Sequence, residues 1–365
     1  MLIKVNRKEL TKHISIVQKA ISQRTTMQIL EGIKITAKDN TLILIATDTE
    51  ISIETKLKAI VEREGEIVIN SRLFGDIVRK LENDIINISV ENYMMNLKCG
   101  DSIFNISTQK ADEYPDLPKV EDDIKIIISA KDLKNIVKKT TFAVSTDESR
   151  IVFTGVLMDI KKNFINFVAL DGFRMAIQKL VKETGIENKV IIPSRSLNEL
   201  VKIIDDDIDV ALNISRNNIV FKFDETVFYS TLLSGEFFSY SALLRDENKI
   251  STTVSKREFQ LAVERASLLA REDRANLIKL NVNENYINIK SNSEIGDVFE
   301  KVRTSEHDEN LDIAFNSRYV LDGVKILESE DIVLNFTDSV NPLIITEAED
   351  ETYIYLLIQI GRAHV

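Results

Sequence analysis

The sequence has few of the residues that metal sites and enzymes use. It contains one cysteine and three histidines among 365 residues. Cys99 therefore cannot form a disulfide within the chain, and we expect it to be a small half-buried side chain. No histidine has a neighbouring nucleophile or the spacing of a metal ligand. The patterns G-x-x-x-x-G-K-[ST] and G-x-G-x-x-G are absent too. We expect no catalytic residue, no metal ion and no cofactor.

Long apolar segments are missing as well. No apolar run is long enough to cross a bilayer, and the N-terminus "MLIKVNRKEL" lacks the apolar core of a secretory signal. We therefore expect a cytoplasmic protein. Apolar residues make up 44% of the chain and charged residues 29%, which is the normal balance of a globular protein with sizeable cores. A chain of this length is too long for one ordinary domain.

The chain repeats itself with a fixed period. Ser71, Ser194 and Ser317 follow one another at intervals of 123 residues, and each stands in the pattern strand, Ser-Arg, helix. The same offset relates Leu10 to Leu133 and Tyr114 to Phe237. Such self-similarity marks repeated structural units. We predict three domains with boundaries near residues 121 and 246, namely 1–121, 122–246 and 247–365.

Each repeat combines helical and strand patterns. A short apolar strand comes before each of two helices, and stretches of alternating apolar and polar residues lie between them, as at Ile287 and Ile289. Six helices are predicted, at residues 8–20, 72–82, 131–139, 195–204, 256–271 and 318–327. With β-branched residues so abundant, each unit should be two helices packed on antiparallel sheet. The predicted fold class is α+β.

Charge is distributed unevenly between these helices and the rest of the chain. The net formal charge of −11 alone argues against a partner made of phosphates. The six predicted helices nevertheless sum to +10, which leaves −21 on everything else. In the second helix of each repeat, two cations stand seven residues apart, nearly two turns, and so should share one face. These pairs are Arg72 with Arg79, Arg195 with Lys202, and Arg318 with Lys325.

The basic faces favour a polyphosphate partner that is contacted without base readout. No aromatic platform for single strands accompanies them, so duplex DNA is favoured. Non-specific phosphate contacts give dissociation constants of only about 10⁻⁴ to 10⁻⁶ M, which is too weak to hold a protein on DNA for long. A repeated unit could instead close into a ring through a symmetric oligomer. Retention would then be topological.

Three alternatives remain at this stage. The basic residues could be ordinary solvated faces of amphipathic helices. The chain could be an enzyme, although the run Asp205–Asp207, its one candidate metal site, is better explained as a turn after a helix. It could also be a repeat scaffold that binds proteins and never touches DNA. A ring should stay bound to circular DNA and be released when that DNA is cut, whereas the alternatives should behave alike on circular and linear DNA.

The segments "FVALDGFRMAI" and "SQRTTMQILEGIKI" match motifs of a known family. They resemble the "ATDGHRLA" motif and the "RxTLPILSNV" segment of bacterial β sliding clamps, the β subunits of DNA polymerase III. In addition, "STDESRIVFTGVLM" and "FNSRYVLDGVKIL" are similar to two further segments of the family. The resemblance covers all three repeats in matching order.

The resemblance implies a non-catalytic processivity factor. It implies a head-to-tail homodimer whose six domains form a ring around duplex DNA, opened by a clamp loader and tethering the replicative polymerase and repair proteins. According to the resemblance, eight residues face DNA: Arg24, Arg72, Arg79, Arg195, Lys202, Arg318, Tyr319 and Lys325. It also implies a dimer interface at which Phe104 and Ile106 of one subunit meet Leu268 and Leu269 of the next.

The family also carries an apolar pocket for short peptides of its partners. The resemblance implies that this pocket is lined in the present chain by Phe153, Leu170, Gly172, Phe173, Arg174, Met175, Phe238, Leu243, Leu356, Ile358 and Ile360. We expect Gly172 to allow close backbone approach and Arg174 to be available to peptide carbonyls. Without the motif, Phe153, Leu170 and Met175 could equally be core residues.

The chain departs from the family pattern at this pocket. The family's His is Phe173, its usual Thr is Leu170 and its Pro is Phe238, so we expect a more apolar and narrower pocket. The chain ends "YLLIQIGRAHV" where the family ends near "YLIMPMRL". We interpret "IGRAHV" as translated sequencing-adapter sequence that replaces part of the pocket rim.

Overall fold

A computed structural model describes residues 1–22, 25–119, 124–244, 248–271 and 276–360. The chain divides into two compact units, which are described separately. Unit 1 comprises Met1–Leu133 and Arg195–Leu232, and unit 2 comprises Lys134–Ser194 and Leu233–Val365. This division cuts through the middle repeat, and the predicted boundaries at 121 and 246 fall on residues outside the described ranges. Those boundaries stay a prediction.

Unit 1 contains two antiparallel sheets. The five-stranded sheet has the order β5 (Ile60–Arg63), β1 (Leu2–Asn6), β7 (Ile85–Glu91), β8 (Met94–Cys99) and β9 (Ser102–Ser107). The eight-stranded sheet has the order β10 (Ile124–Ser129), β15 (Asp209–Ile214), β16 (Asn218–Phe223), β17 (Thr226–Thr231), β4 (Ile51–Lys58), β3 (Thr41–Thr47), β2 (Gly32–Lys38) and β6 (Gly65–Asn70). The pairing of β17 with β4 joins strands of two different repeats.

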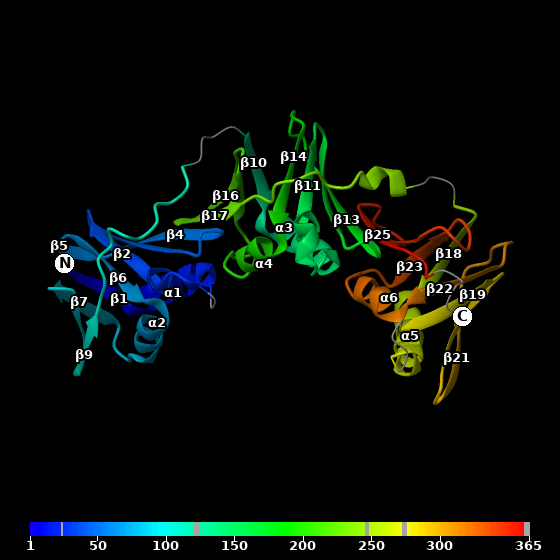
Figure 1. The fold of residues 1–365 in the computed structure, drawn as a ribbon, viewed down its shortest axis with the longest axis horizontal. Coiled ribbons are helices and arrows are strands. Elements are labelled where there is room, and N and C mark those ends of the chain that lie inside the picture. The colour runs from blue at the N-terminus through cyan, green and yellow to red at the C-terminus, as the bar shows by residue number, and fades with distance from the viewer. Residues whose placement is uncertain (23–24, 120–123, 245–247, 272–275, 361–365) are drawn as a thin grey trace. The chain divides into compact units, whose positions relative to one another are not determined.

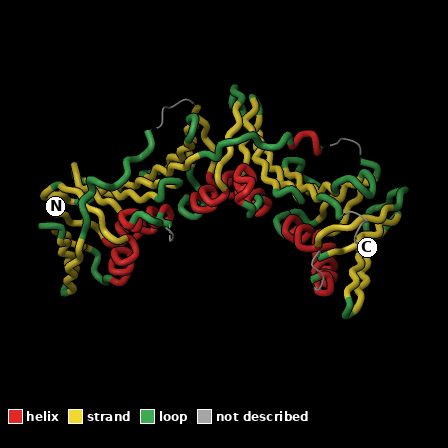
Figure 2. Tube along the Cα trace, viewed as in Figure 1, coloured by secondary structure: helices red, strands yellow, loops and turns green. Residues whose placement is uncertain are grey.

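The helices of unit 1 pack on these sheets. They are α1 (Arg7–Val17), the 3₁₀ turns η1 (Gln18–Ala20) and η2 (Gln28–Glu31), α2 (Ser71–Lys80) and α4, which begins at the unit boundary (Ser194–Leu200). In α1, Leu10, Ile14 and Val17 are three and four residues apart and fully buried, as a helix that covers a sheet requires. Figure 2 shows α1 and α2 on one side of the eight-stranded sheet, where α1 contacts β3 and β4.

Unit 2 is built in the same manner. Its eight-stranded sheet has the order β14 (Asn188–Pro193), β11 (Gly155–Lys161), β12 (Phe164–Leu170), β13 (Arg174–Val181), β25 (Tyr353–Leu357), β24 (Leu343–Glu347), β23 (Asp331–Phe336) and β18 (Ile250–Ser255). Its four-stranded sheet has the order β21 (Gly296–Arg303), β20 (Tyr286–Ser293), β19 (Leu277–Asn283) and β22 (Leu311–Asn316). Here β13 and β25 join two repeats side by side (Figure 1).

The helices of unit 2 are α3 at the unit boundary (Ala130–Thr140), η3 (Thr141–Ala143), η4 (Glu148–Thr154), η5 (Tyr240–Leu243), α5 (Lys256–Ala270) and α6 (Ser317–Val324). Helix α5 covers the four-stranded sheet and packs against α6. No helix among the described residues combines the length and the apolar character that crossing a bilayer requires.

The predicted repeat is visible in the positions of the elements. Helices α2, α4 and α6 begin at Ser71, Ser194 and Ser317, the three positions that define the period. One backbone hydrogen bond also recurs where the first helix of each repeat begins. Arg7 N donates to Asp84 O at 2.8 Å, Ala130 N donates to Ile208 O at 2.9 Å, and Lys256 N donates to Glu330 O at 2.9 Å. The α+β fold with three repeated clamp units is confirmed.

Some predicted details are wrong. Helix α4 ends at Leu200 and not at residue 204, and turns follow it. The three aspartates at 205–207 come next, and acidic groups are unfavourable at a helix C-terminus because they face its negative dipole end. Helices α2 and α6 also end two and three residues earlier than predicted. Cys99 is fully buried rather than half-buried, and its thiol donates to Asn83 O at 3.4 Å.

Candidate nucleic-acid interface

A cleft in unit 1 lies between the end of the first helix and the start of α2. The side chain of Asn70 caps α2 by accepting from Leu73 N at 3.0 Å, so the first turn of the helix is fixed. The cleft has a volume of about 860 Å³. Its lining residues are Gln18, Ile21, Ser22, Glu31, Asn70, Ser71, Arg72, Asp76 and Arg79.

A second cleft, in unit 2, occupies the equivalent place at the start of α6. Its volume is about 420 Å³, and its lining residues are Ser267, Arg271, Asn276, Ser317, Arg318, Leu321, Asp322 and Lys325. Four lining positions of this cleft stand 246 residues, or two periods, after those of the first: Ser71 and Ser317, Arg72 and Arg318, Asp76 and Asp322, Arg79 and Lys325. Both clefts combine a helix N-terminus with two cations, an arrangement that attracts phosphate groups.

The predicted basic residues are exposed, but most of them are paired with carboxylates. Arg195 lies 2.5 Å from Asp48 and 3.4 Å from Glu50. Ion pairs also hold Arg79, Lys202 and Lys325. In the described part of the chain, no ion pair forms at Arg72 or Arg318. These two arginines are the most available cations of the predicted set.

The remaining predicted DNA-facing residues have other surroundings. Arg24 lies outside the described residues. Lys202 stands in the turn after α4, so the argument that it shares a helix face with Arg195 is wrong, because α4 ends before it. Lys325 caps the C-terminus of α6. Tyr319 is half-buried, and its ring is stacked on Phe173 with the centroids 6.0 Å apart.

The predicted peptide-pocket residues separate into a buried layer and a surface layer. Leu170, Met175 and Leu356 belong to a buried cluster of unit 2, against which Phe153 and Leu243 pack half-buried. Phe173, Phe238 and Ile358 are exposed, with 60%, 46% and 39% of their surface accessible. Ile358 N donates to Phe173 O at 2.8 Å and so is tied to this surface, whereas Ile360 N donates to Ala314 O of β22 at 2.9 Å.

Gly172 forms the turn that presents Phe173. Its φ of +93° lies in the left-handed region, which favours glycine, and no atom stands within 4 Å of the position of an added Cβ. Asp171 closes the turn by accepting from Phe173 N at 2.9 Å and from Arg174 N at 3.0 Å. The positive φ explains why this position holds glycine, and the expected close approach of a peptide backbone stays a prediction.

Arg174 uses its guanidinium within unit 2, and its availability to peptide carbonyls stays a prediction. Its Nε donates to Asp171 at 3.0 Å, its Nη1 to Asp322 at 2.6 Å and its Nη2 to Phe142 O at 3.0 Å. The guanidinium also lies 4.6 Å from the centre of the Tyr319 ring. Burial alone would lower the pKa of Arg174, but Tyr355, Asp322 and Asp171 raise it above its usual value. Every guanidinium nitrogen is engaged within unit 2, because two carboxylates face it there.

The predicted dimer residues lie at two sheet edges. Phe104 is half-buried and Ile106 is buried on β9, the last strand of the five-stranded sheet. Leu268 is 62% exposed on α5, and Leu269 beside it is half-buried. Helix α5 packs on β21, the last strand of the four-stranded sheet.

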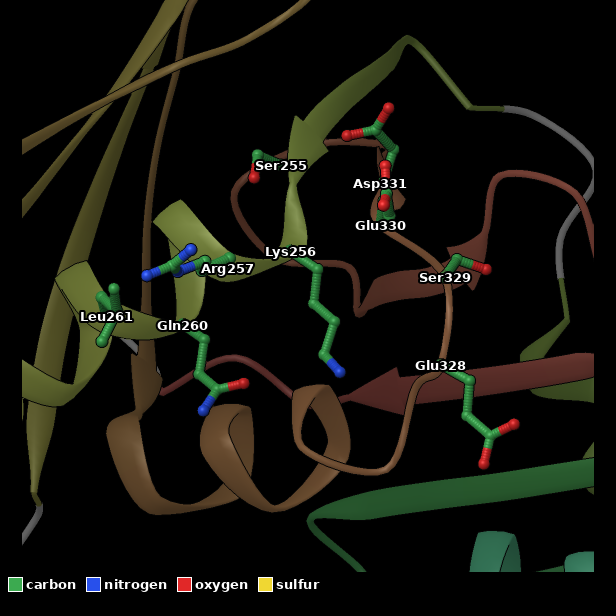
Figure 3. Close-up of a pocket in the computed structure, with 9 residues that line it drawn as sticks. All are labelled: Ser255, Lys256, Arg257, Gln260, Leu261, Glu328, Ser329, Glu330 and Asp331. Atoms are coloured by element: carbon green, nitrogen blue, oxygen red, sulfur yellow. The ribbon is translucent and has the colours of Figure 1, made fainter.

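A further cleft has mixed charge. Figure 3 shows Lys256 and Arg257, from the start of α5, together with Glu328 and Glu330 from the loop before β23 and Asp331 at the start of that strand. The ammonium of Lys256 donates to Leu327 O at 2.5 Å, and Glu328 pairs with Lys138 at 2.6 Å. The cleft holds cations and carboxylates together, which suits neither a phosphate backbone nor an apolar peptide.

The histidines carry no enzyme-like arrangement within the described ranges. His13 is buried at the β4–β17 junction, where its Nδ1 lies 2.7 Å from the hydroxyl of Thr55, and burial lowers its pKa. His307 has two buried ring nitrogens without a partner in the described residues. No group of three or more His, Cys, Asp or Glu side chains in that part of the chain is placed to hold a metal ion.

Reasoning from the sequence missed the acidic partners of the basic helices. Asp76 stands three residues before Arg79, and Glu199 stands three residues before Lys202, a spacing that brings side chains together on a helix. That signal was present in the sequence. The pairing of Lys325 with Glu264, from a different helix, had no local signal.

Three family models match consecutive parts of the chain. They describe the N-terminal, central and C-terminal domains of the DNA polymerase III beta subunit and match residues 1–118, 127–238 and 241–360. The beta sliding clamp of Bacillus subtilis is 36% identical, with 99% of each chain covered. That of Staphylococcus epidermidis is 39% identical, with 94% of each chain covered.

Solved structures agree with these matches. The crystal structure of the DNA polymerase sliding clamp from Bacillus subtilis matches with a TM-score of 0.95 at 36% identity and covers 99% of both chains. The DNA polymerase III beta subunit from Thermotoga maritima matches with a TM-score of 0.92 at 26% identity and covers 99% of this chain and 100% of that one. The chain therefore belongs to the DNA polymerase III beta subunit family, the beta sliding clamps, and is a non-catalytic processivity factor with DNA and a polymerase as its partners.

Proposed function

We propose that two copies of the chain assemble head to tail into a closed ring around duplex DNA, which is retained because it is linked to the DNA. A closed ring must be opened to admit a duplex without ends, so the proposal includes a clamp loader. The proposed place of action is the cytoplasm. The observation that carries the proposal is a strand-to-strand junction that occurs twice within the chain.

The two junctions have the same construction. In unit 1, β17 pairs antiparallel with β4, and Phe228 stands opposite Ile53. In unit 2, β25 pairs antiparallel with β13, and Tyr355 stands opposite Ala176. By the repeat, β9 is the counterpart of β17 and β25, and β21 is the counterpart of β4 and β13. Both are edge strands in the described chain, and their unpaired N–H and C=O groups favour pairing with another strand.

The repeat also supplies a register for a third junction, between β9 of one copy and β21 of the next. The hairpins β16–β17 and β8–β9 correspond with an offset of 124 residues, so Phe104 takes the position of Phe228. The hairpins β12–β13 and β20–β21 correspond with an offset of 122 residues, so Val298 takes the position of Ala176. Phe104 of one copy is then expected opposite Val298 of the other.

A side-chain contact at the existing junction supports the same register. The rings of Phe142 and Tyr355 lie 5.6 Å apart where β25 meets β13. Helices α3 and α5 begin 126 residues apart, so Leu268 takes the position of Phe142, and Phe104 takes that of Tyr355. The repeat therefore brings the exposed Leu268 of one copy against Phe104 of the next, with Leu269 and Ile106 beside them.

Phosphate contacts then need only centre the duplex. Arg72 and Arg318 carry no ion pair among the described residues and line equivalent clefts, while Arg79, Arg195, Lys202 and Lys325 are paired. A lining of this kind gives weak, salt-sensitive binding without base readout. Weak contact together with a closed ring allows the protein to move along DNA.

The test of the ring is retention on circular DNA. We expect protein loaded on a nicked circular plasmid by a clamp loader to remain bound through gel filtration in high salt. Cutting the plasmid once should release nearly all of it, because the ring slides off the ends. Protein that stays equally on the circle and on the linear form, or on neither, would contradict topological retention.

We also propose that Phe173, Phe238 and Ile358 form the surface that receives short apolar peptides of partner proteins. Exposed apolar side chains are common singly, but a group of them beside a packed core marks a binding surface. Here Met175, Leu356 and Phe237, each within two residues of one of the three in the chain, belong to one buried cluster or pack against it. Arg174 has no direct part in this proposal, because its guanidinium is already engaged.

Replacing Phe173 by alanine should weaken binding of the replicative polymerase about 30-fold, since a buried aromatic contact in an interface contributes roughly 2 kcal/mol. Surface plasmon resonance with the polymerase subunit measures this. Val181→Ala is the matched control, because Val181 is 72% exposed at the far end of β13. Equal affinity of the Phe173 variant and the wild type would remove Phe173 from the surface.

A further inference from the structure

The second cation of each predicted basic pair is held by a carboxylate in all three repeats. The three pairs, with their N–O distances, are Arg79 with Asp76 at 2.7 Å, Lys202 with Glu199 at 2.7 Å, and Lys325 with Glu264 at 3.4 Å. Asp76 and Glu199 stand 123 residues apart, at equivalent positions of their repeats. The pairing is therefore a repeated feature of these helices.

The third repeat keeps the pairing by other means. Its equivalent carboxylate, Asp322, is bound to Arg174 and so is engaged elsewhere. Glu264 of α5 pairs with Lys325 in its place, and its pKa is lowered by hydrogen bonds from Gln260 and then Lys325. The same cation is paired although the acid comes from a different helix, which favours a role for the pairing itself.

Stability does not account for these pairs. The side chains of Arg79 and Asp76 are 41% and 53% exposed, and Lys202 and Lys325 are 52% exposed beside the half-buried Glu199 and Glu264. Exposed ion pairs contribute only about 0 to 1 kcal/mol to folding. Their effect on a phosphate backbone is larger, because a carboxylate beside a cation both occupies the cation and repels the phosphate.

The cleft at α2 shows the competition directly. Arg79 lies in this cleft with its Nη2 on Asp76 and its Nη1 3.1 Å from Gln18 Oε1. A phosphate that entered the cleft would have to displace Asp76 from the guanidinium. A phosphate in this cleft can therefore bind Arg72 directly, but it can bind Arg79 only if the ion pair with Asp76 breaks.

From this arrangement we propose that Asp76, Glu199 and Glu264 limit the grip of the basic helices on duplex DNA, so that the ring slides instead of adhering. The proposal rests on the proposed function. A cation that neutralises a phosphate steepens the slope of log K against log salt by about 0.9. Releasing three cations should steepen the slope by about 3 and raise the affinity about 10²-fold near 0.1 M salt.

The test is the triple variant Asp76→Asn, Glu199→Gln, Glu264→Gln in the full chain. Its binding to a short linear duplex, titrated by fluorescence anisotropy at several salt concentrations, should show the higher affinity and the steeper slope. Loaded on long DNA and followed by single-molecule tracking, the variant should diffuse more slowly than the wild type. Its thermal unfolding should be unchanged, because all three pairs are exposed.

The matched control removes three acids that are paired with cations on strands. Glu62→Gln, Glu66→Gln and Glu91→Gln release Lys4, Lys34 and Arg63 and change the net charge by the same amount. The control should bind short DNA nearly as the wild type does. An equal rise in DNA affinity in both variants would assign the effect to total charge and overturn the inference. An unchanged salt slope in the Asp76, Glu199 and Glu264 variant would overturn it too.

These outcomes separate the inference from the proposed function. If the wild type is retained on nicked circles but the helix variant keeps the wild-type slope, only the inference fails. If the wild type is not retained on circular DNA, the proposed ring is wrong. The salt dependence of binding to short duplex then still shows whether the three acids weaken phosphate binding by the cations.

Discussion

Aspartate at Leu268 and at Phe104 is expected to convert the proposed dimer into monomers. The proposed junction places these two side chains against each other, so each substitution buries a charge without a partner, at a cost of about 3 kcal/mol. A head-to-tail ring of two copies contains this junction twice, so either substitution alone costs the dimer about 6 kcal/mol, or roughly 10⁴-fold in its dissociation constant, and the double variant costs it at least as much. Sedimentation velocity at micromolar concentration measures the change.

Val340→Asp is the control for this prediction. Val340 is 70% exposed in a loop of unit 2 outside both edge strands, so its charge should leave the dimer intact. The double variant should also lose retention on nicked circles while keeping its folded circular dichroism spectrum. A dimer that survives both substitutions would mean that β9 and β21 are not the joining edges.

The second large effect is expected at Arg174, whose replacement by methionine should destabilise unit 2 by about 3 kcal/mol. Methionine preserves much of the side-chain volume but leaves Asp171 and Asp322 without their cation, and a buried ion pair broken on one side costs this much. It also removes the guanidinium that stacks on Tyr319. Urea unfolding followed by fluorescence measures the free energy of unfolding.

The control for this variant is Lys162→Met, which removes an exposed cation from a hairpin turn of the same unit. It should change the free energy of unfolding by less than about 0.5 kcal/mol. Adding Asp322→Asn to Arg174→Met should restore part of the lost stability, because one uncompensated carboxylate is then gone. An Arg174 variant as stable as the control would show that the network contributes nothing to folding.

The repeated part of the fold could be read from the sequence because it depends on local patterns. A serine before an arginine at a period of 123 residues marked the starts of α2, α4 and α6. The spacing of Leu10, Ile14 and Val17 marked the buried face of α1. Capping and periodicity act over a few residues, so the order of residues along the chain is enough to show them.

The junctions between repeats could not be read in this way. Strand β4 pairs with β17 across more than 170 residues, and neither strand carries a pattern that names its partner. The same holds for Arg174, whose motif says that an arginine is present but not that Asp322, 148 residues away, binds it. Long-range partners are chosen by the packing of whole elements, which a local pattern does not describe.

Each eight-stranded sheet is completed by strands from two different repeats, and this limits how the chain could be divided. A fragment holding a single repeat would carry both kinds of complementary strand edge on one small body, with nothing to cover either. Such a fragment would add copies of itself end to end and grow into open fibres whenever the angle between neighbours failed to close. Covalent linkage of three repeats in one polypeptide keeps two of every three such edges satisfied before any second molecule arrives.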